Sequence, residues 1–284
     1  MSEKMHNTVL TVAKLEEGAT LQDFLARRLK LSKRGAKDLI DQRQGWVNRQ
    51  CIWMARHRLR CGDAVEARAG TAAQVAQRPG KIRILSETDR YLFADKPCGM
   101  LTIGPGGLEE ILREQTGNGS LRCVHRIDKD TSGCLLVAKD DEAFDAAVSV
   151  FKTRRVKKLY NFLAVGKIED DASTIATPID GQPAKTTIRR IACNEDATFG
   201  SARIETGRTH QIRIHLASVR HPIVGDRVHG LKASRDSRFT HVPRQMLHAV
   251  ELELDDPMGR GHLRAHSPLP ADFRRCLRMF GLGK

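Results

Sequence analysis

The first part of the chain distributes apolar residues at the spacing of two short helices. Thr20 and Ser32 stand just before the two apolar stripes and can cap the helices. Each stripe follows the i, i+3, i+4 pattern of one helix face. The members are Leu21, Phe24, Leu25 and Leu29 in the first stripe and Ala36, Leu39 and Ile40 in the second. We expect Gly45 to end the second helix and residues 46–50 to turn as a short hairpin.

The rest of the chain shows the shorter spacing that is typical of strands. Strands are expected at 82–85, 91–94, 134–138 and 159–165. A helix capped by Asp140 is predicted in between, with an apolar face that runs from Phe144 to Phe151. Residues 69–80 are small and polar and end in Pro-Gly, which indicates a linker. The pattern therefore predicts two separately folded parts.

The net charge indicates a polyanionic partner. The 284-residue chain has 48 Lys and Arg against 34 Asp and Glu, a formal net charge of +14. Nucleic acid is the commonest partner of such a chain, and a membrane surface is the alternative. No apolar run approaches the roughly 20 residues that span a bilayer, and the N-terminus has no signal-peptide core. We therefore expect a soluble, cytoplasmic protein with no membrane partner.

The seven cysteines and eleven histidines predict no metal site. The cysteines form no C-x-x-C pair and no zinc-finger pattern, so scattered free thiols explain them best. Cys123 and Cys134 flank the segment 125–133, but their apolar neighbours favour buried strand positions over a catalytic thiol. His210 and His215 lie five residues apart in a segment that we interpret as strand-like, which would point them to opposite faces.

Much of the positive charge is concentrated in the first part of the chain. Residues 27–60 contain eleven Lys and Arg against two Asp, a net charge of +9. Lys33, Arg34 and Lys37 belong to this cluster and are expected to contact RNA phosphates, which give affinity and register but little sequence information. The alternative is a solvated basic face without a ligand. Aromatic residues make up only 5% of the chain, so base stacking is not the main expected binding mode.

One loop carries a conspicuous carboxylate. The stretch 125–133 reads His-Arg-Ile-Asp-Lys-Asp-Thr-Ser-Gly and sets Asp128 between Arg126 and Lys129, directly before an apolar run. That order predicts an active-site loop that enters a buried strand. The alternative interpretation is a solvated loop whose Asp only balances nearby charge.

Two further motifs accompany this loop. Lys158-Leu159-Tyr160 contains one of only two tyrosines in the chain, and residues 205–215 read Glu-Thr-Gly-Arg-Thr-His-Gln-Ile-Arg-Ile-His. By itself, Tyr160 is also compatible with ordinary packing in a sheet. In the second motif we expect alternation, with Ile212 and Ile214 toward the core and Arg213 on the opposite side.

Together, these motifs resemble the signatures of the pseudouridine synthases that modify large ribosomal and transfer RNAs. The H-R-I-D loop, K-x-Y and T-G-R-T-H-Q-I-R-x-H carry the resemblance, with R-x-x-L-H-A and P-L-P near the C-terminus. A K-P-x-G-x-x-T segment at 96–102 is similar to one at the entrance to that family's active-site cleft. Residues 13–68 resemble the small RNA-binding module called the S-four-like domain.

The resemblance implies an α+β protein. A tail at 1–12, an α/β RNA-binding module at 13–68 and a linker at 69–80 would precede a catalytic domain at 81–284. That domain would contain a mixed, mainly antiparallel sheet flanked by helices. Asp128 would be the catalytic carboxylate, Tyr160 would meet the uracil, and Arg213 would pair with Asp128. The residues expected to contact RNA near the site are His125, Arg126, Lys158, Arg208, His210 and Gln211.

The reaction would isomerise uridines in structured RNA, with large-subunit ribosomal RNA as the expected substrate and tRNA as the alternative. No cofactor is expected, because the reaction is redox-neutral and the chain lacks nucleotide-binding glycine motifs. We also expect a monomer. Two other classes remain open: a non-catalytic RNA-binding or ribosome-assembly factor, and a nucleoside hydrolase. Departures from the family pattern at Asp95, His229 and Asp256 leave the three proposed catalytic residues unchanged.

Overall fold

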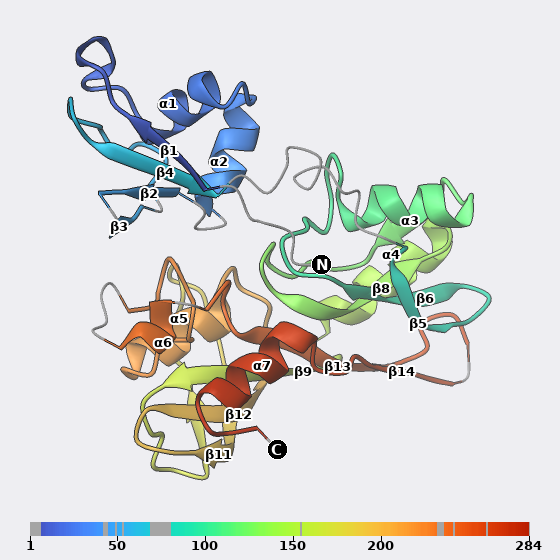
Figure 1. The fold of residues 1–284 in the computed structure, drawn as a ribbon. Helices are drawn as coiled ribbons and strands as arrows, with labels where there is room; N and C mark the ends of the chain where they lie inside the picture. Colours follow the sequence, from blue (N-terminus) through green and yellow to red (C-terminus); the bar gives the residue numbers. More distant parts are fainter. Residues whose placement is uncertain are drawn as a thin grey trace, which may run out of the picture. The chain divides into compact units, whose positions relative to one another are not determined.

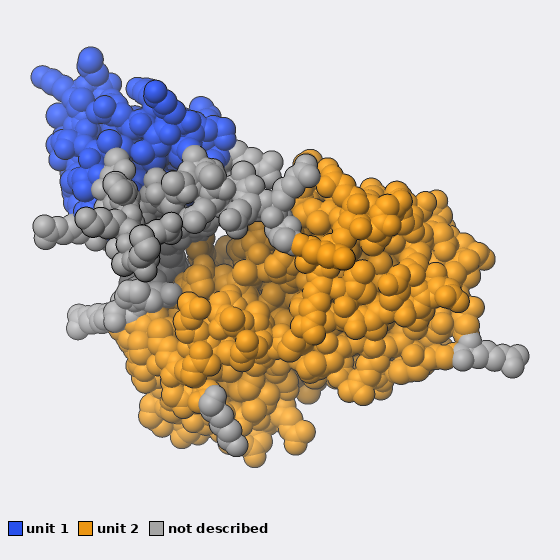
Figure 2. Space-filling view, turned by 45° about the vertical axis from the view of Figure 1, so that its right-hand side comes forward, with its two compact units in different colours: residues 1–80 blue, residues 81–284 orange. Residues whose placement is uncertain are grey.

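The computed structural model divides the chain into two compact units, residues 1–80 and 81–284 (Figure 2). The structure describes residues 7–41, 45–48, 50–52, 54–68, 81–153, 155–231, 236–240, 242–259 and 261–283. The expected linker at 69–80 lies outside these residues. None of the described helices is long and apolar enough to cross a membrane.

Unit 1 contains two helices and a small sheet. Its elements are β1 (Asn7–Thr11), the 3-10 helix η1 (Lys14–Glu16), α1 (Leu21–Arg28), α2 (Lys33–Asp41), β2 (Gly45–Val47), β3 (Gln50–Cys51) and β4 (Ala64–Arg68). The strands are ordered β1-β4-β2-β3. Thr20 Oγ1 accepts a hydrogen bond from Asp23 N, and Ser32 Oγ accepts one from Gly35 N, so both predicted caps are confirmed.

The predicted tail at 1–12 is wrong in its second half. Residues 7–11 form β1, which pairs antiparallel with β4 from Asn7–Arg68 to Thr11–Ala64. The short run Val9-Leu10-Thr11 has no clear apolar alternation, and β4, its partner among the described strands, lies more than fifty residues away in the sequence. Local patterning therefore could not identify it. The predicted helix end at Gly45 is also wrong, because α2 ends at Asp41 and Gly45 is the first residue of β2.

Unit 2 is built on one large sheet. Its described strands are β5 (Arg83–Glu87), β6 (Tyr91–Lys96), β7 (Arg122–Cys123), β8 (Ser132–Ala138), β9 (Lys157–Val165), β10 (Ala172–Ile175), β11 (Thr186–Cys193), β12 (Ala197–Ile204), β13 (Leu247–Asp255) and β14 (His262–His266). The main path is β10-β11-β12-β9-β13-β8-β6-β5, with β7 beside β8 and β14 beside β13. Among the pairings described, β8 with β13 is parallel and the others are antiparallel, which confirms the predicted mixed sheet.

Helices cover both faces of this sheet (Figure 1). They are α3 (Leu108–Thr116), α4 (Asp141–Lys152), α5 (Gln211–Ser218), α6 (Ser237–Thr240) and α7 (Ala271–Met279). The apolar residues of α3 and α5 share a core with Leu135 and Val137 of β8. Helix α4 packs on the opposite side of β8, against Cys134 and Leu136, and α7 packs against Leu163 of β9. With both faces covered, all seven residues of β8 are buried, which explains its continuous apolar run.

The segment after residue 210 corrects the expected strand. Gln211–Ser218 is the helix α5, in which both Ile212 and Arg213 are buried while Ile214 is partly exposed. A helix turns by about 100° per residue, so adjacent side chains can both face the protein interior. In a strand they would point to opposite faces. The predicted cap of α4 is confirmed, since Asp140 accepts a hydrogen bond from Ala143 N at 2.9 Å.

Candidate active site

Asp128 lies in the loop between β7 and β8, next to the parallel junction of β8 with β13. At this junction Ser132 is paired with His248, and Gly133 with Ala249. Gly133 has a φ of +117°, and a Cβ atom there would lie 2.1 Å from the carbonyl oxygen of Ala249. Only glycine permits this backbone conformation and this close approach. The glycine that ends the loop motif therefore lets β8 begin directly beside β13.

Arg213 extends from α5 to the carboxylate of Asp128. Its Nη1 donates to Asp128 Oδ2 at 3.0 Å, as the resemblance implied. Asp128 keeps 23% of its side chain exposed, whereas Arg213 exposes only 5%. Gln245 Nε2 also reaches Asp128 Oδ2, at the hydrogen-bond limit of 3.5 Å. The carboxylate is thus held from one side while another part of it stays accessible.

A second carboxylate, which the sequence analysis did not single out, holds Arg213 in place. Arg213 Nε and Nη2 donate to the two oxygens of Asp226 at 2.7 and 2.8 Å. Asp226 Oδ1 also accepts from the backbone N–H groups of Val228 and His229. Burial acts to raise the pKa of Asp226, but the hydrogen bonds from Arg213 and the backbone outweigh it, so the net pKa is lowered. In the sequence, Asp226 is marked only by the Gly-Asp dipeptide at 225–226, which does not by itself indicate the partner of an arginine.

The K-P-x-G-x-x-T segment lies behind the Asp128 loop. The fully buried ammonium of Lys96 donates to Lys129 O at 2.9 Å and to two carbonyls of its own turn. Thr102 Oγ1 donates to Ile127 O at 3.1 Å and accepts from Ile127 N at 3.3 Å. Burial lowers the pKa of Lys96 to about 7. Both side chains are buried, so they hold the residues on either side of Asp128 instead of lining a cleft entrance.

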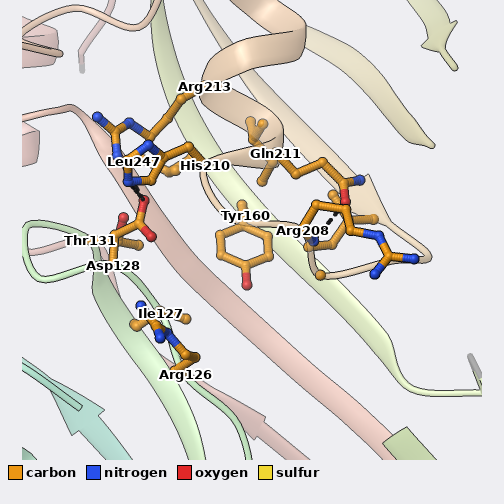
Figure 3. Close-up of a pocket in the computed structure, with 13 residues that line it drawn as sticks. Arg126, Ile127, Asp128, Thr131, Tyr160, Arg208, His210, Gln211, Arg213 and Leu247 are labelled. Carbon is orange, nitrogen blue, oxygen red and sulfur yellow. Dashed lines mark hydrogen bonds and ion pairs between the residues drawn. The ribbon is translucent and has the colours of Figure 1, made fainter. Parts of the chain in front are cut away.

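A cavity opens beside Asp128 (Figure 3). Including its open mouth, the cavity has a volume of about 420 Å³. Its apolar walls include Tyr160, Ile204 and Leu247, while Arg126 and Arg208 add positive charge. Burial raises the pKa of the Tyr160 hydroxyl, and the negative charge of Asp128 adds to the shift, so this hydroxyl remains neutral at physiological pH. The lining combines one carboxylate, apolar surfaces and several cations.

The structure brings most of the expected site residues together. Those that line the cavity are Arg126, Asp128, Tyr160, Arg208, His210, Gln211 and Arg213. Gln211 is buried and its amide is fully engaged. Its Oε1 accepts from Thr206 Oγ1 and Arg208 N, and its Nε2 donates to Lys185 O and Thr186 Oγ1. Gln211 therefore joins the Arg208 loop to β11.

Two expected RNA-contacting residues do not line the cavity. The ring of His125 stacks on Phe151 at a centroid distance of 4.9 Å, and its Nε2 accepts from Leu136 N. Burial, with a smaller contribution from the charge of Lys158, lowers the pKa of His125 to about 3. Lys158 Nζ lies 5.8 Å from the centre of the same Phe151 ring. Both side chains thus lie near Phe151 of α4, and Lys158 Nζ also lies close to Gly207 at the edge of the cavity.

His210 connects the site to one of the departures from the family pattern. Its Nε2 lies 4.0 Å from Asp128 Oδ2, and its Nδ1 is 3.0 Å from Nε2 of His229. His210 has a φ of +56° at the start of α5, a conformation that non-glycine residues seldom adopt. Burial is the main cause that lowers the pKa of His229.

The expected phosphate contacts of unit 1 lie on α2. Lys33 is highly exposed and pairs with Asp23 at 3.0 Å, and Lys37 is also exposed. The side chain of Arg34 lies outside the described residues. Within the described ranges, no group of three His, Cys, Asp or Glu side chains has an arrangement that could hold a metal ion.

Comparisons with known proteins give the context for this site. Residues 90–218 match the family model described as RNA pseudouridylate synthase. The chain is 33% identical to ribosomal large subunit pseudouridine synthase D of Nitrosomonas europaea, over 97% of this chain and 89% of the relative. It is 29% identical to ribosomal large subunit pseudouridine synthase C of Vibrio cholerae, over 92% of each protein.

The fold of this chain is also similar to that of a solved pseudouridylate synthase structure. Human RNA pseudouridylate synthase domain containing 1 superposes with a TM-score of 0.60 at 26% sequence identity. The match covers 69% of this chain and 87% of the human chain. The sequence match over nearly the full length and the shared architecture agree with the motifs around Asp128. The chain therefore belongs to the RNA pseudouridine synthase family.

Proposed function

We propose that this enzyme isomerises specific uridines of large-subunit ribosomal RNA to pseudouridine and that Asp128 is its catalytic carboxylate. The observation that supports this role is the position of Asp128 in the wall of a cavity that Tyr160 also lines. One of its carboxylate oxygens accepts a hydrogen bond from Arg213. The named relatives that act on the large ribosomal subunit favour ribosomal RNA over tRNA. They also support a cytoplasmic location.

The reaction breaks the N1–C1′ bond of uridine, turns the uracil and joins its C5 to C1′. A carboxylate suits this chemistry because it can attack the anomeric carbon or stabilise positive charge there. Removal of the C2′ proton by the same carboxylate is the second route. For either route, Arg213 fixes the orientation of Asp128. The neutral Tyr160 offers a ring face to the uracil and a hydroxyl for a hydrogen bond.

The target base must leave its stack before it can enter the cavity. Enzymes that act on a base within structured RNA pay for unstacking with contacts to the extruded nucleotide and to the space that it leaves. Arg126 lies at the cavity wall two residues before Asp128. We assign Arg126 to the space that the extruded base leaves in the RNA stack. Arg208, which also lines the cavity, is assigned to contacts with the phosphates or the base.

Unit 1 is proposed to bind the RNA outside the active site as an S-four-like module, with the whole protein acting as a monomer. Its two helices carry basic residues on exposed positions, and residues 27–60 have a net charge of +9. Such a surface attracts phosphates without reading bases. In this arrangement unit 2 selects the base, and unit 1 sets the position along the structured RNA at which the enzyme binds.

The experiment that tests the catalytic role replaces Asp128 by Asn. The variant keeps the size of the side chain but lacks the carboxylate, so we expect isomerisation to be abolished while RNA affinity stays within a few-fold. Tritium release from [5-³H]uridine-labelled ribosomal RNA measures turnover, and filter binding measures affinity. Turnover of the variant near that of the wild type would refute the assignment of Asp128, whereas a wild-type protein that binds the RNA without turnover would favour a non-catalytic RNA-binding factor.

A further inference from the structure

The loop that carries Asp128 is held by a second ion pair, Arg244 with Asp272, and neither residue lines the cavity that contains Tyr160. Arg244 exposes 5% of its side chain, and its Nε donates to Asp272 Oδ2 at 2.7 Å. Its Nη2 reaches the other carboxylate oxygen of Asp272 at 3.2 Å. Asp272 lies in the first turn of α7, so this pair connects the C-terminal helix to the segment before β13.

The remaining donors of Arg244 point to the catalytic loop. Nη1 donates to Asp130 O at 3.1 Å, and Nη2 donates to Ser132 Oγ at the same distance. The neighbouring Gln245 binds Thr131 Oγ1 through its Nε2 at 2.8 Å. Residues 130–132 are therefore all held by two consecutive side chains. Because each contact is buried or partly buried, loss of a partner would leave a polar group unsatisfied.

This support reaches Asp128 through the backbone. Thr131 N donates to Asp128 O at 3.0 Å, which closes a tight turn between the catalytic residue and the held segment. A displacement of 130–132 would therefore move the Asp128 backbone, although neither Arg244 nor Asp272 touches its carboxylate. Arg213 constrains the side chain, and the second pair constrains the main chain.

Asp272 is needed because Arg244 is buried with a full positive charge. Among the described contacts of Arg244, Asp272 is the acidic partner of the guanidinium. The other acceptors are backbone carbonyls and a hydroxyl. Without Asp272, the guanidinium would be drawn toward solvent or toward another carboxylate, and the forked geometry that meets the loop would be lost.

We propose that Arg244 and Asp272 are positioning residues for uridine isomerisation and that, through them, helix α7 holds the Asp128 loop in its reactive geometry. This inference rests on the proposed catalytic role of Asp128. It predicts that a change at Asp272 lowers the rate without a loss of RNA binding, because Asp272 lines neither the cavity beside Tyr160 nor the adjoining hollow that Arg244 shares with Asp128. A misplacement of about 1 Å at a reacting group lowers a rate by roughly 100-fold.

The test uses the full-length enzyme and unmodified large-subunit ribosomal RNA transcribed in vitro. For Asp272→Asn we expect the single-turnover rate to fall by roughly 10- to 100-fold, with the dissociation constant changed by less than about 3-fold. Asp272→Glu retains the negative charge and should recover a large part of that rate. If the Asn variant does not fold, Arg244→Lys takes its place, because it keeps the buried charge but lacks the fork that reaches Asp272 and the loop together; the same loss of rate is expected, and a wild-type rate would refute the positioning role.

Leu277→Ala is the matched control. Leu277 is buried on the same helix, and its shortening loosens the packing of α7 without removing a contact of Arg244. We expect this variant to lower the melting temperature but to keep its rate within about 3-fold at a temperature where it is folded. If both variants lose rate in proportion to stability, or if Asp272→Asn is as fast as the wild type, the positioning role is refuted.

Asp128→Asn distinguishes failure of this inference from failure of the proposed function. An inactive Asp128→Asn together with a fully active Asp272→Asn would overturn only the role of the second pair. An active Asp128→Asn would remove the catalytic assignment on which the inference rests and would overturn both.

Discussion

At the scale of single residues, the site depends on how buried charges are paired. Arg213 contacts two carboxylates, but it shares two hydrogen bonds with Asp226 and one with Asp128. The fully buried Asp226 thus fixes the guanidinium, and the remaining nitrogen is directed to the partly exposed Asp128. This division separates the structural partner of the arginine from its functional partner.

Replacement of Arg213 by Ala is expected to lower turnover far more than RNA affinity. The variant leaves Asp128 without its oriented ion pair and Asp226 as a buried charge without a partner. We expect a rate loss of roughly 100-fold or more, and an affinity loss of only a few-fold. Single-turnover kinetics and filter binding on the same RNA measure the two effects. Equal losses would make Arg213 an ordinary phosphate contact.

Replacement of Asp226 by Asn should destabilise the protein in a pH-dependent way. Breaking a buried pair costs about 3–5 kcal/mol of unfolding free energy at pH 7. The folded-state pKa of Asp226 is lowered below 3.8, so its contribution is present above about pH 4 and is lost as pH falls through the folded pKa. Urea denaturation of both proteins should show a difference that is constant above about pH 4 and shrinks as pH falls further below it. A difference that does not vary with pH would contradict the ion-pair explanation.

At the scale of elements, the site forms where β8 and β13 begin side by side and where α5 faces them. The β7–β8 loop supplies Asp128, β9 supplies Tyr160, and α5 supplies Arg213. The parallel pairing of β8 and β13 is short, with two residue pairs, and it depends on the missing side chain of Gly133. These elements are far apart in the sequence, so the sheet must form before the site exists.

Gly133→Ala is expected to disturb this junction. A Cβ atom would overlap the carbonyl of Ala249, and the φ of +117° would itself be strained. We expect a loss of roughly 2–5 kcal/mol in unfolding free energy, as overpacking and backbone strain add. Gly119→Ala is the control, because no atom lies within 4 Å of its added Cβ and its φ is not positive. Similar midpoints in urea for both variants would refute the close-approach argument.

At the scale of the whole molecule, the two units have separate apolar cores. The core of unit 1 uses buried residues from Val12 to Ala67, and the cores of unit 2 begin at Ile82. No described buried residue belongs to both. Each unit therefore has the internal packing that independent folding requires.

Removal of residues 1–80 should leave a folded catalytic unit with weaker RNA binding. The deletion removes the +9 cluster at 27–60, so the dependence of affinity on salt should flatten. Each lost phosphate contact lowers the slope of log affinity against log salt by roughly 0.7–0.9. Binding titrations at several salt concentrations measure the slope for both forms. Activity of the deletion variant on a short single-stranded RNA should persist. An unchanged slope would show that the basic cluster faces solvent.

The sequence by itself determined most of the local elements and most of the residues that line the site. Caps such as Thr20 and Asp140 act within a few residues, and the apolar runs of β6, β8 and β9 report directly on burial. The motif around Asp128 predicted its pairing with Arg213 through a family resemblance, and the geometry agrees. These features depend on neighbours along the chain, or on residue patterns that are specific enough to identify a protein family.

Only the tertiary structure decided how that site is held. The eight residues of α5 are too few to distinguish helical from strand periodicity, and their Ile residues favour the strand interpretation. Helix α5 forms because it packs on the sheet. The partners of Arg213, Arg244 and Lys96 beyond the motif come from distant segments. Which buried cation meets which carboxylate or carbonyl is set by three-dimensional packing, and no local spacing encodes it.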